Sequence, residues 1–237
     1  MRPDVLLVLP AWNEAENIRG VVAELRDVRP ADDIVVVDDG SLDGTTAAAA
    51  AAGCLVVTLP FHLGYGAAVQ AGVKYGHRRG YAVVVTFDAD GQHDPGDIAP
   101  LAACIREGAD LALGSRFLAR GSYRGGVVRQ AGRRVFSGLT WLLTGLRISD
   151  PTSGLKALGV RAQTLFALAG FPDRFPDADA LVLARRARLT VVERPARMRP
   201  SHNRHSMHGG YRAVAYTFNM CLSLLVAAAG RETDLRG

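Results

Sequence analysis

The sequence is poor in cysteine and has no apolar segment long enough to cross a membrane. Its three cysteines, Cys54, Cys104 and Cys221, lie far apart, and they show neither zinc-site spacing nor the density of a disulfide framework. We therefore expect a reducing, cytoplasmic setting. The longest uncharged apolar run, 218–229, is shorter than the ~20 residues of a membrane-spanning helix. We also expect no signal peptide, because the first four residues lead directly into an apolar run.

Acidic residues are fewer than basic ones, with 23 Asp and Glu against 28 Lys and Arg, so the formal net charge is +5. The excess lies mainly in two arginine-rich stretches, 116–134 and 185–204. Such stretches either are solvated surface or serve an anionic substrate, a membrane surface or nucleic acid. Nucleic acid is the least favoured partner, since neither an aromatic stacking array nor a DNA-binding motif accompanies the arginines.

A complete dinucleotide-binding glycine motif is also missing. Gly64 and Gly66 precede a predicted helix, but no third glycine follows at the required spacing and the pair does not follow the first strand. These two departures exclude a Rossmann dehydrogenase.

The first half of the chain alternates short apolar runs, typical of buried strands, with segments of helical periodicity. We predict strands over 5–9, 34–37, 55–59, 81–87 and 109–114, and helices over 14–28, 44–52, 66–77 and 95–107. The second half is less regular, with predicted helices over 127–144, 177–187 and 211–231, strands near 158 and over 190–194, and loops over 119–126 and 200–210. Strand–helix alternation predicts an α/β fold with a mostly parallel central sheet and helices on both faces.

Polar residues follow three of these strands. Asp88 and Asp90 end the strand over 81–87, Asp38 and Asp39 follow the strand over 34–37, and the first strand leads to Glu14. Open α/β sheets bind ligands beyond the carboxyl ends of their strands, and Mg²⁺ or Mn²⁺ takes carboxylate oxygens. Turn chemistry alone could explain either acidic pair, but three strand ends at one edge predict a nucleotide-sugar site.

These motifs resemble family 2 glycosyltransferases of the GT-A fold, nearest the dolichol-phosphate mannose synthase-like, polyprenyl-phosphate glycosyltransferase branch. The matching segments span nearly the whole chain in order: Pro10-Ala11-Trp12-Asn13-Glu14, 37–45, 63–68, Asp88-Ala89-Asp90-Gly91-Gln92, Gly114-Ser115-Arg116-Phe117 and Ser149-Asp150-Pro151-Thr152-Ser153-Gly154. The resemblance implies one domain over 1–237. Residues 1–115 would form a nucleotide-sugar half and 116–210 an acceptor half, and the terminal helix over 211–231 would be either core or membrane-docking.

The resemblance also assigns roles in the donor half. It implies that Mg²⁺ or Mn²⁺ is bound by Asp88, Asp90 and Gln92. It implies a nucleotide-sugar site made by Pro10, Ala11, Glu14, Asp38, Asp39, Asp88, Ala89 and Asp90. Of Asp38 and Asp39, we expect one to contact the nucleotide and the other to cap the following helix. His93 is expected to be a surface loop residue.

In the acceptor half, the resemblance implies that an acceptor phosphate is held by Arg116, Arg133 and Ser137, with Arg116 and Arg133 joining Asp90 as catalytic residues. Arg133 and Ser137 are four apart and share a helical face, and arginine binds phosphate bidentately. Arg134 is a rival for Arg133. Asp150 either orients a substrate or belongs to an ordinary turn.

Three positions depart from the branch: His62 and Trp141 stand where asparagine is usual, and Lys156 where arginine is usual. The segment 199–208 is expected to form a basic lid.

The resulting hypothesis is a metal-dependent, inverting transfer of a hexose from a UDP- or GDP-sugar to a polyprenyl phosphate. An ionised phosphate can attack without a base, its second pKa being about 6, whereas a hydroxyl of a glycan or small molecule needs a carboxylate base. Asp177 and Asp179 are the candidates for that alternative. A nucleotide-sugar-binding module without turnover is the non-enzyme alternative. We expect the protein to be peripheral at the cytoplasmic face of a membrane, on lipid or a membrane-protein partner.

Overall fold

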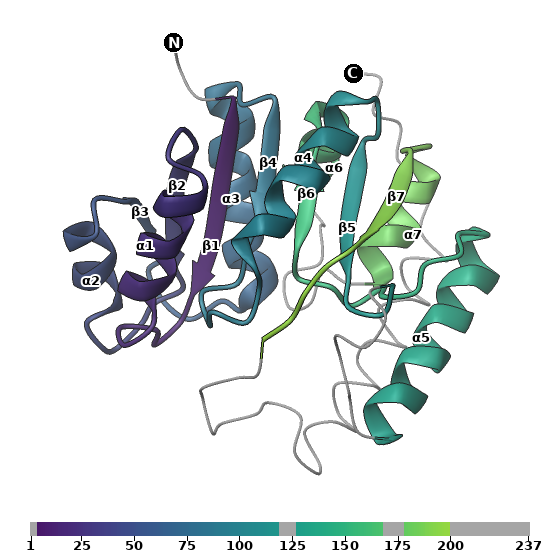
Figure 1. Ribbon diagram of the computed structural model, residues 1–237, viewed down its shortest axis with the longest axis horizontal. Helices are drawn as coiled ribbons and strands as arrows, with labels where there is room; N and C mark the ends of the chain where they lie inside the picture. The colour runs from purple at the N-terminus through teal and green to yellow at the C-terminus, as the bar shows by residue number, and fades with distance from the viewer. Residues whose placement is uncertain (1–3, 119–126, 168–177, 200–237) are drawn as a thin grey trace.

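The computed structural model describes residues 4–118, 127–167 and 178–199, with side chains in the long helix α5 only from Phe136 onward. Within this part, one seven-stranded sheet has the order β3-β2-β1-β4-β6-β5-β7 (Figure 1). The strands are β1 (Val5–Ala11), β2 (Asp33–Asp38), β3 (Leu55–Thr58), β4 (Val83–Thr86), β5 (Leu111–Ser115), β6 (Lys156–Leu158) and β7 (Val191–Pro195). Only β6 runs antiparallel to its neighbours, β4 and β5. The prediction of a mostly parallel α/β sheet is confirmed.

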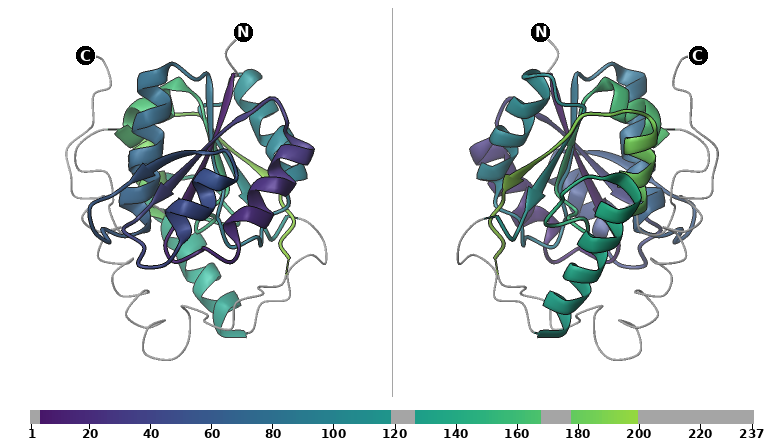
Figure 2. Two further views of the ribbon diagram at one scale, coloured as in Figure 1. Left: turned by 90° about the vertical axis from the view of Figure 1, so that its left-hand side faces the viewer. Right: turned by 90° about the vertical axis from the view of Figure 1, so that its right-hand side faces the viewer.

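Helices cover both faces of the sheet, as the edge-on views in Figure 2 show. On one face, α1 (Ile18–Val28), α2 (Thr45–Ala51) and α4 (Ile98–Arg106) share a core with Leu7 and Leu9 of β1. On the other, α3 (Tyr65–Arg79), α6 (Val160–Ala167) and α7 (Ala178–Arg186) share a core with Leu6 and Val8. Successive β1 side chains therefore enter opposite cores, which explains why this strand reads as an unbroken apolar run.

Helix α3 lies unusually close to the sheet, because two of its buried positions are glycine. A Cβ at Gly72 would lie 2.2 Å from Cγ1 of Val8, and one at Gly76 would lie 2.5 Å from Cγ2 of Val84. Glycine at both positions lets the helix backbone approach β1 and β4. This approach fixes where the first residue of α3, Tyr65, lies beyond the strand ends.

The helix boundaries differ locally from the sequence predictions. α1 begins at Ile18 rather than at Glu14, because residues 14–17 form a turn in which the amides of Asn17 and Ile18 bond to the Glu14 carbonyl. The helix expected from Pro95 begins as a 3-10 turn, Pro95–Asp97, before α4.

Helix α6 was not predicted. It is 8 residues long, and it packs against α3.

Helix α5 (Val127–Thr144) was predicted with the bounds that the structure has, and it packs against α7 beyond β7 (Figure 1). The loops expected over 119–126 and 200–210 and the terminal helix over 211–231 lie outside the described residues. In the described segments, no helix is long and apolar enough to span a bilayer.

Candidate functional site at the carboxyl ends of the strands

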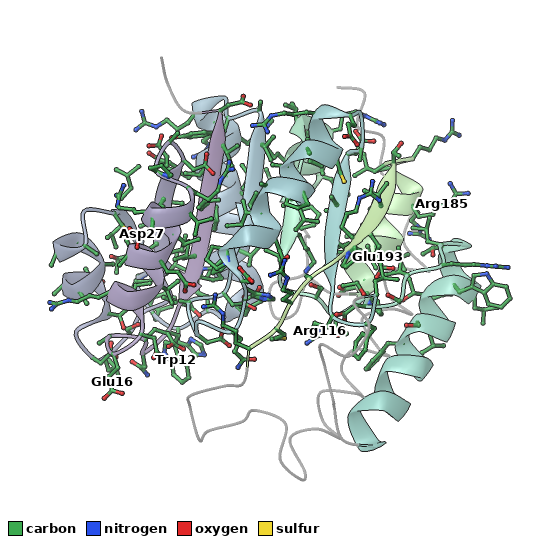
Figure 3. The ribbon with its side chains drawn as sticks, in the orientation of Figure 1. Trp12, Glu16, Asp27, Arg116, Arg185 and Glu193 are labelled. Carbon is green, nitrogen blue, oxygen red and sulfur yellow. The ribbon has the colours of Figure 1, made fainter. Side chains whose placement is uncertain are left out.

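Three parallel strands bring their ends to one edge of the sheet. Ala11, at the end of β1, is the register partner of Asp38 at the end of β2, and the Asp39 amide donates to the Ala11 carbonyl at 2.9 Å. On the other side of β1, β4 runs parallel and leads into Phe87 and Asp88. Figure 3 shows Trp12 and Arg116 at this same lower edge of the molecule. The expected convergence of three strand ends is confirmed.

Asp88 is held from two sides. The Tyr65 hydroxyl donates to Oδ1 at 2.9 Å, and His93 Nε2 lies 3.0 Å from Oδ2. Burial works to raise the pKa of Asp88, but the pKa is lowered overall, because His93 and Tyr65 donate hydrogen bonds and Lys156 adds positive charge. The carboxylate is therefore ionised and fixed in orientation.

Asp90 is in a different electrostatic state. It is half-buried, and its carboxylate accepts a hydrogen bond from the Gln92 amide at 3.0 Å within its own loop. Burial raises the pKa of Asp90, and the negative charge of Asp88 raises it further. The ionised form of Asp90 is thus less well stabilised by its surroundings than that of Asp88.

The expectation that His93 is a surface loop residue is wrong. Its side chain is 3% exposed and lies against the Phe87 ring, with 5.7 Å between ring centroids. Its backbone also forms an antiparallel β-bridge with Met198. The local sequence around His93 did not predict its pairing with Met198.

Asp38 has a local, helix-capping set of partners. Its carboxylate accepts from the Ser41 amide at 2.9 Å and from the Thr46 hydroxyl in the first turn of α2. Asp43 also lies at this helix start, where its carboxylate accepts from the Thr45 amide at 2.9 Å and Gly44 is the N-cap residue.

Asp39 instead reaches the loop that precedes α3. It accepts from the amides of Leu63 and Gly64, each at 2.8 Å, and it pairs with Nδ1 of His62 at 2.8 Å. The intervening Gly40 has φ +67°, and a Cβ there would lie 2.6 Å from the backbone of Phe61. The two carboxylates thus divide their contacts: Asp38 orders α2, and Asp39 joins the loops after β2 and β3.

An exposed aromatic stack stands beside these loops. The rings of Trp12 and His62 are parallel within 18°, with centroids 4.1 Å apart, and each side chain is about half exposed. Neither residue was assigned a role from the sequence, although Trp12 lies in a recognised motif and His62 was noted as a departure. Glu14, which was assigned to the nucleotide, is half-buried nearby, and burial and the charges of Asp90 and Asp88 raise its pKa.

The guanidinium of Arg116 is held by neighbouring polar groups. Its Nε and Nη2 bind the two carboxylate oxygens of Asp150 at 2.6 and 2.7 Å, and Nη2 also donates to the Thr152 hydroxyl at 3.0 Å. Asp150 is fully buried. The carboxylate of Glu193, on β7, in turn accepts from the Asp150 amide at 2.8 Å. Asp150 and Glu193 are site residues that the sequence reasoning left undecided or missed.

Ser137, the second acceptor candidate, lies against the same loop. Its hydroxyl donates to the Ser149 carbonyl at 3.4 Å, and the Ser149 hydroxyl bonds to that of Ser115 at 2.7 Å. Arg133 belongs to α5, one turn before Ser137, but its side chain lies outside the described set. The structure therefore brings Ser137 and Arg116 to one loop.

The loop 150–154 connects the two halves of the site. At its start Asp150 holds Arg116, and at its end Gly154 lies so close to Asp88 that a Cβ would come within 2.5 Å of Oδ2. Lys156 follows as the first residue of β6 and is buried. Asp88 and Arg116 thus both lie against this one loop.

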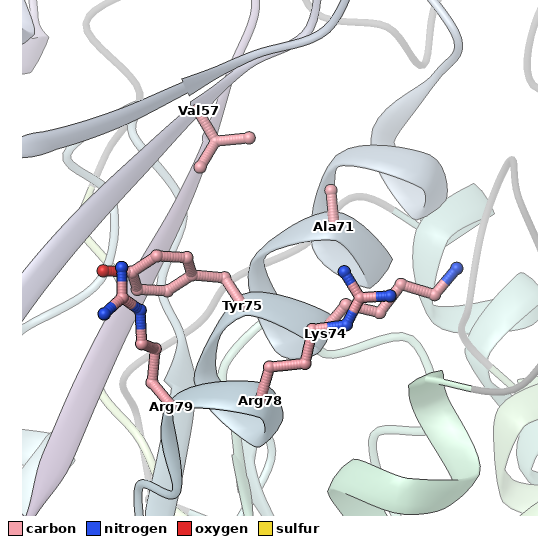
Figure 4. A pocket seen from close by; sticks show the side chains of 6 residues that line it. All are labelled: Val57, Ala71, Lys74, Tyr75, Arg78 and Arg79. Atoms are coloured by element: carbon pink, nitrogen blue, oxygen red, sulfur yellow. The ribbon is translucent and has the colours of Figure 1, made fainter.

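Three further candidates remain: the possible base residues, a surface hollow and any cluster of metal-binding side chains. Asp179, a possible base, is buried and accepts from the Ala180 amide, while Asp177 lies outside the described residues. A hollow of about 360 Å³ lies beside the edge strand β3, lined by Val57 and by α3 residues from Ala71 to Arg79 (Figure 4). It lies along the second half of α3, away from the end that carries Tyr65, so it is not the site described above. Among the described residues, no three His, Cys, Asp or Glu side chains are grouped to hold a metal.

Comparison with known proteins agrees with this geometry. Residues 6–162 match the family described as glycosyl transferase family 2. The chain is 37% identical over 159 residues to a polyprenol monophosphomannose synthase of Mycolicibacterium smegmatis, covering 64% of this chain and 60% of that protein. It is also 37% identical over 176 residues to an undecaprenyl-phosphate mannosyltransferase of Micrococcus luteus, covering 69% of each. The chain thus spans about 60 to 70% of the length of these relatives.

A solved structure supports the fold independently. Glucosyl-3-phosphoglycerate synthase from Mycobacterium tuberculosis, crystallised with Mn²⁺, UDP and glucosyl-3-phosphoglycerate, aligns with a TM-score of 0.73 and 23% identity over 97% of this chain and 81% of that one. At this identity the likeness shows the GT-A fold alone. With the strand-end carboxylates in place and the family match over most of the described sheet, the chain belongs to glycosyl transferase family 2.

Proposed function

We propose that this protein transfers a hexose from a UDP- or GDP-sugar to a polyprenyl phosphate, with inversion and with the help of a divalent cation. The observation that carries the proposal is the placement of Asp88 and Asp90 at the end of β4, beside the ends of β1 and β2 and joined to Arg116 through the loop 150–154. The similarity to a polyprenol monophosphomannose synthase and to an undecaprenyl-phosphate mannosyltransferase supports the acceptor class.

The residues present fit a divalent cation. Burial and the neighbouring Asp88 raise the pKa of Asp90, so a cation would relieve a charge that is costly as it stands. Asp88, Asp90 and the amide oxygen of Gln92 would hold Mg²⁺ or Mn²⁺, and a bound cation supplies charge neutralisation for the leaving diphosphate. The solved structure with Mn²⁺ and UDP supports this choice of cofactor.

The donor nucleotide would lie across the ends of β1 and β2. Backbone groups of Pro10 and Ala11 flank it there, and Trp12 offers an exposed aromatic face beside Asp39. Of the two adjacent carboxylates, we propose Asp39 for the nucleotide contact, because it pairs with His62 of the exposed aromatic stack, whereas the contacts of Asp38 are directed to the first turn of α2. Burial and the negative charges of Asp90 and Asp88 raise the pKa of Glu14. Glu14 would therefore contact the nucleotide only when a bound cation offsets the repulsion among these carboxylates.

The acceptor phosphate would be bound by Arg116, Ser137 and Arg133. Arg116 is held in place by Asp150, and a guanidinium with five N–H donors can contact a second anion while it keeps that ion pair. Since the phosphate is ionised at neutral pH, its oxygen attacks the anomeric carbon without a protein base. This agrees with Asp179 being buried against its own helix backbone.

A polyprenyl acceptor resides in a bilayer, so we propose a peripheral position on the inner face of a membrane. The net charge of +5 favours an anionic surface. The terminal segment 211–231 would supply the contact.

The test measures release of UDP or GDP from a panel of nucleotide sugars, with and without a short-chain polyprenyl phosphate, in Mn²⁺ or in excess chelator. Release that requires both the lipid phosphate and the metal supports the proposal. Arg133→Ala should raise the KM for the acceptor, whereas Arg147→Ala, an exposed arginine just after α5, should not. Turnover with a glycan or small-molecule hydroxyl in place of the phosphate would favour the alternative acceptor class. Nucleotide binding without any turnover would favour a binding module.

A further inference from the structure

His93 is a buried imidazole that the proposed reaction does not use directly. It is 3% exposed, its Nε2 lies 3.0 Å from Oδ2 of Asp88, and Nδ1 has no hydrogen-bond partner in the described part of the chain. A buried polar atom without a partner lowers stability. The burial of this histidine therefore needs an explanation from its other nitrogen.

The other nitrogen provides that explanation. A carboxylate accepts hydrogen bonds, so Nε2 carries the proton and donates to Asp88. Tyr65 donates to the opposite oxygen at 2.9 Å. Two donors from different segments, one on α3 and one in the loop after β4, therefore fix the plane of this carboxylate. Each oxygen still keeps a lone pair for a further ligand.

The histidine is itself held by distant parts of the chain. Its backbone bridges to Met198, and the adjacent Arg199 amide donates to the Gln92 carbonyl at 2.8 Å. Arg199 also pairs with Glu24 of α1 at 2.6 Å. The segment after β7 is thus fastened across the loop that carries Asp90, Gln92 and His93.

We propose that His93 is a positioning residue that orients Asp88 for the divalent cation, acting through its Nε2–H. The inference rests on the proposed metal-dependent function and adds a residue outside the metal-binding set. Hydrogen-bond partners of metal-binding carboxylates typically change metal affinity by about 10- to 100-fold when they are removed.

The test compares three substitutions of His93 that differ in whether the new side chain can donate a hydrogen bond to Asp88. Glutamine can place an N–H at the reach of Nε2, whereas asparagine is too short and leucine has no donor. Binding of Mn²⁺ to the full chain is measured from the electron paramagnetic resonance signal of free Mn²⁺, once with UDP and once with GDP. Unfolding of each variant in urea without metal is followed in parallel. His77→Leu, on α3 at the end away from Tyr65, is the control.

We expect His93→Leu and His93→Asn to weaken Mn²⁺ binding by about 10- to 100-fold, with His93→Gln close to the wild type and His77→Leu unchanged. If His93→Leu fails to fold, the comparison of the glutamine and asparagine variants decides. A lowered unfolding midpoint with unchanged Mn²⁺ affinity would overturn the positioning role and leave the proposed function standing. If the wild type binds no Mn²⁺ with either nucleotide, the metal-dependent function fails and the positioning role fails with it.

Discussion

The ion pair between Arg116 and Asp150 should dominate the stability of the acceptor side of the site. Asp150 is fully buried, whereas the Arg116 side chain is 19% exposed. Two guanidinium contacts of 2.6 and 2.7 Å make the pair bidentate. Replacing either residue with alanine leaves one charge without its partner, but the two losses are unequal, because only the arginine can still reach water.

Breaking a buried ion pair by removing one partner costs about 3–5 kcal/mol. For Arg116→Ala we expect about 3 kcal/mol, the low end of that range, because Asp150 keeps the Arg116 amide at 3.1 Å as a donor. For Asp150→Ala we expect about 2 kcal/mol, since the exposed part of the guanidinium can be solvated. The double variant should lose little more than Arg116→Ala alone, which gives a coupling of about 2 kcal/mol.

Urea unfolding followed by circular dichroism measures all four free energies of the cycle. The activity of Arg116→Ala must be read from its folded fraction, because lost stability would otherwise imitate lost acceptor binding. Arg147→Ala, exposed and outside this contact, controls for the loss of one positive charge. A coupling energy below about 0.5 kcal/mol would refute the reasoning, because substitutions at distant, independent sites depart from additivity by up to that amount.

Four further perturbations test other parts of the structure. Asp90→Asn should lower kcat by about 100-fold or more, while the exposed Asp27→Asn should leave it unchanged; full activity of Asp90→Asn in chelator would contradict the metal site. Gly72→Ala should lower the free energy of unfolding by about 1–3 kcal/mol because its Cβ would overlap a β1 valine. The open helix position Gly20→Ala should raise it by about 0.5–1 kcal/mol. Removing 217–237 should reduce co-sedimentation with anionic vesicles but not nucleotide binding, and unfolding of the shortened chain would instead assign this segment to the core.

Local sequence patterns were sufficient to predict the main strands of the sheet and the positions of Asp88 and Asp90. Apolar runs fixed β1, β2 and β4, since a strand buried on both faces has no polar alternation to obscure it. Asp88 and Asp90 could be placed because parallel strands with helical crossovers direct their carboxyl ends to the same edge. The helix Val127–Thr144 was equally readable from periodicity and brought Ser137 into consideration.

Contacts between segments that are distant in the sequence could not be predicted from local patterns. Insertion of β6 between β4 and β5 in the antiparallel sense carries the loop 150–154 to both Asp88 and Arg116. His93 is buried and its backbone bridges to Met198, although the local turn residues predicted that it would be exposed. Periodicity reports which face of an element is apolar, whereas strand order and register are set by how all the elements pack together. The sequence by itself therefore determined the sheet, its edge and the acidic pair, and only the tertiary structure decided which side chains hold that pair and Arg116 in place.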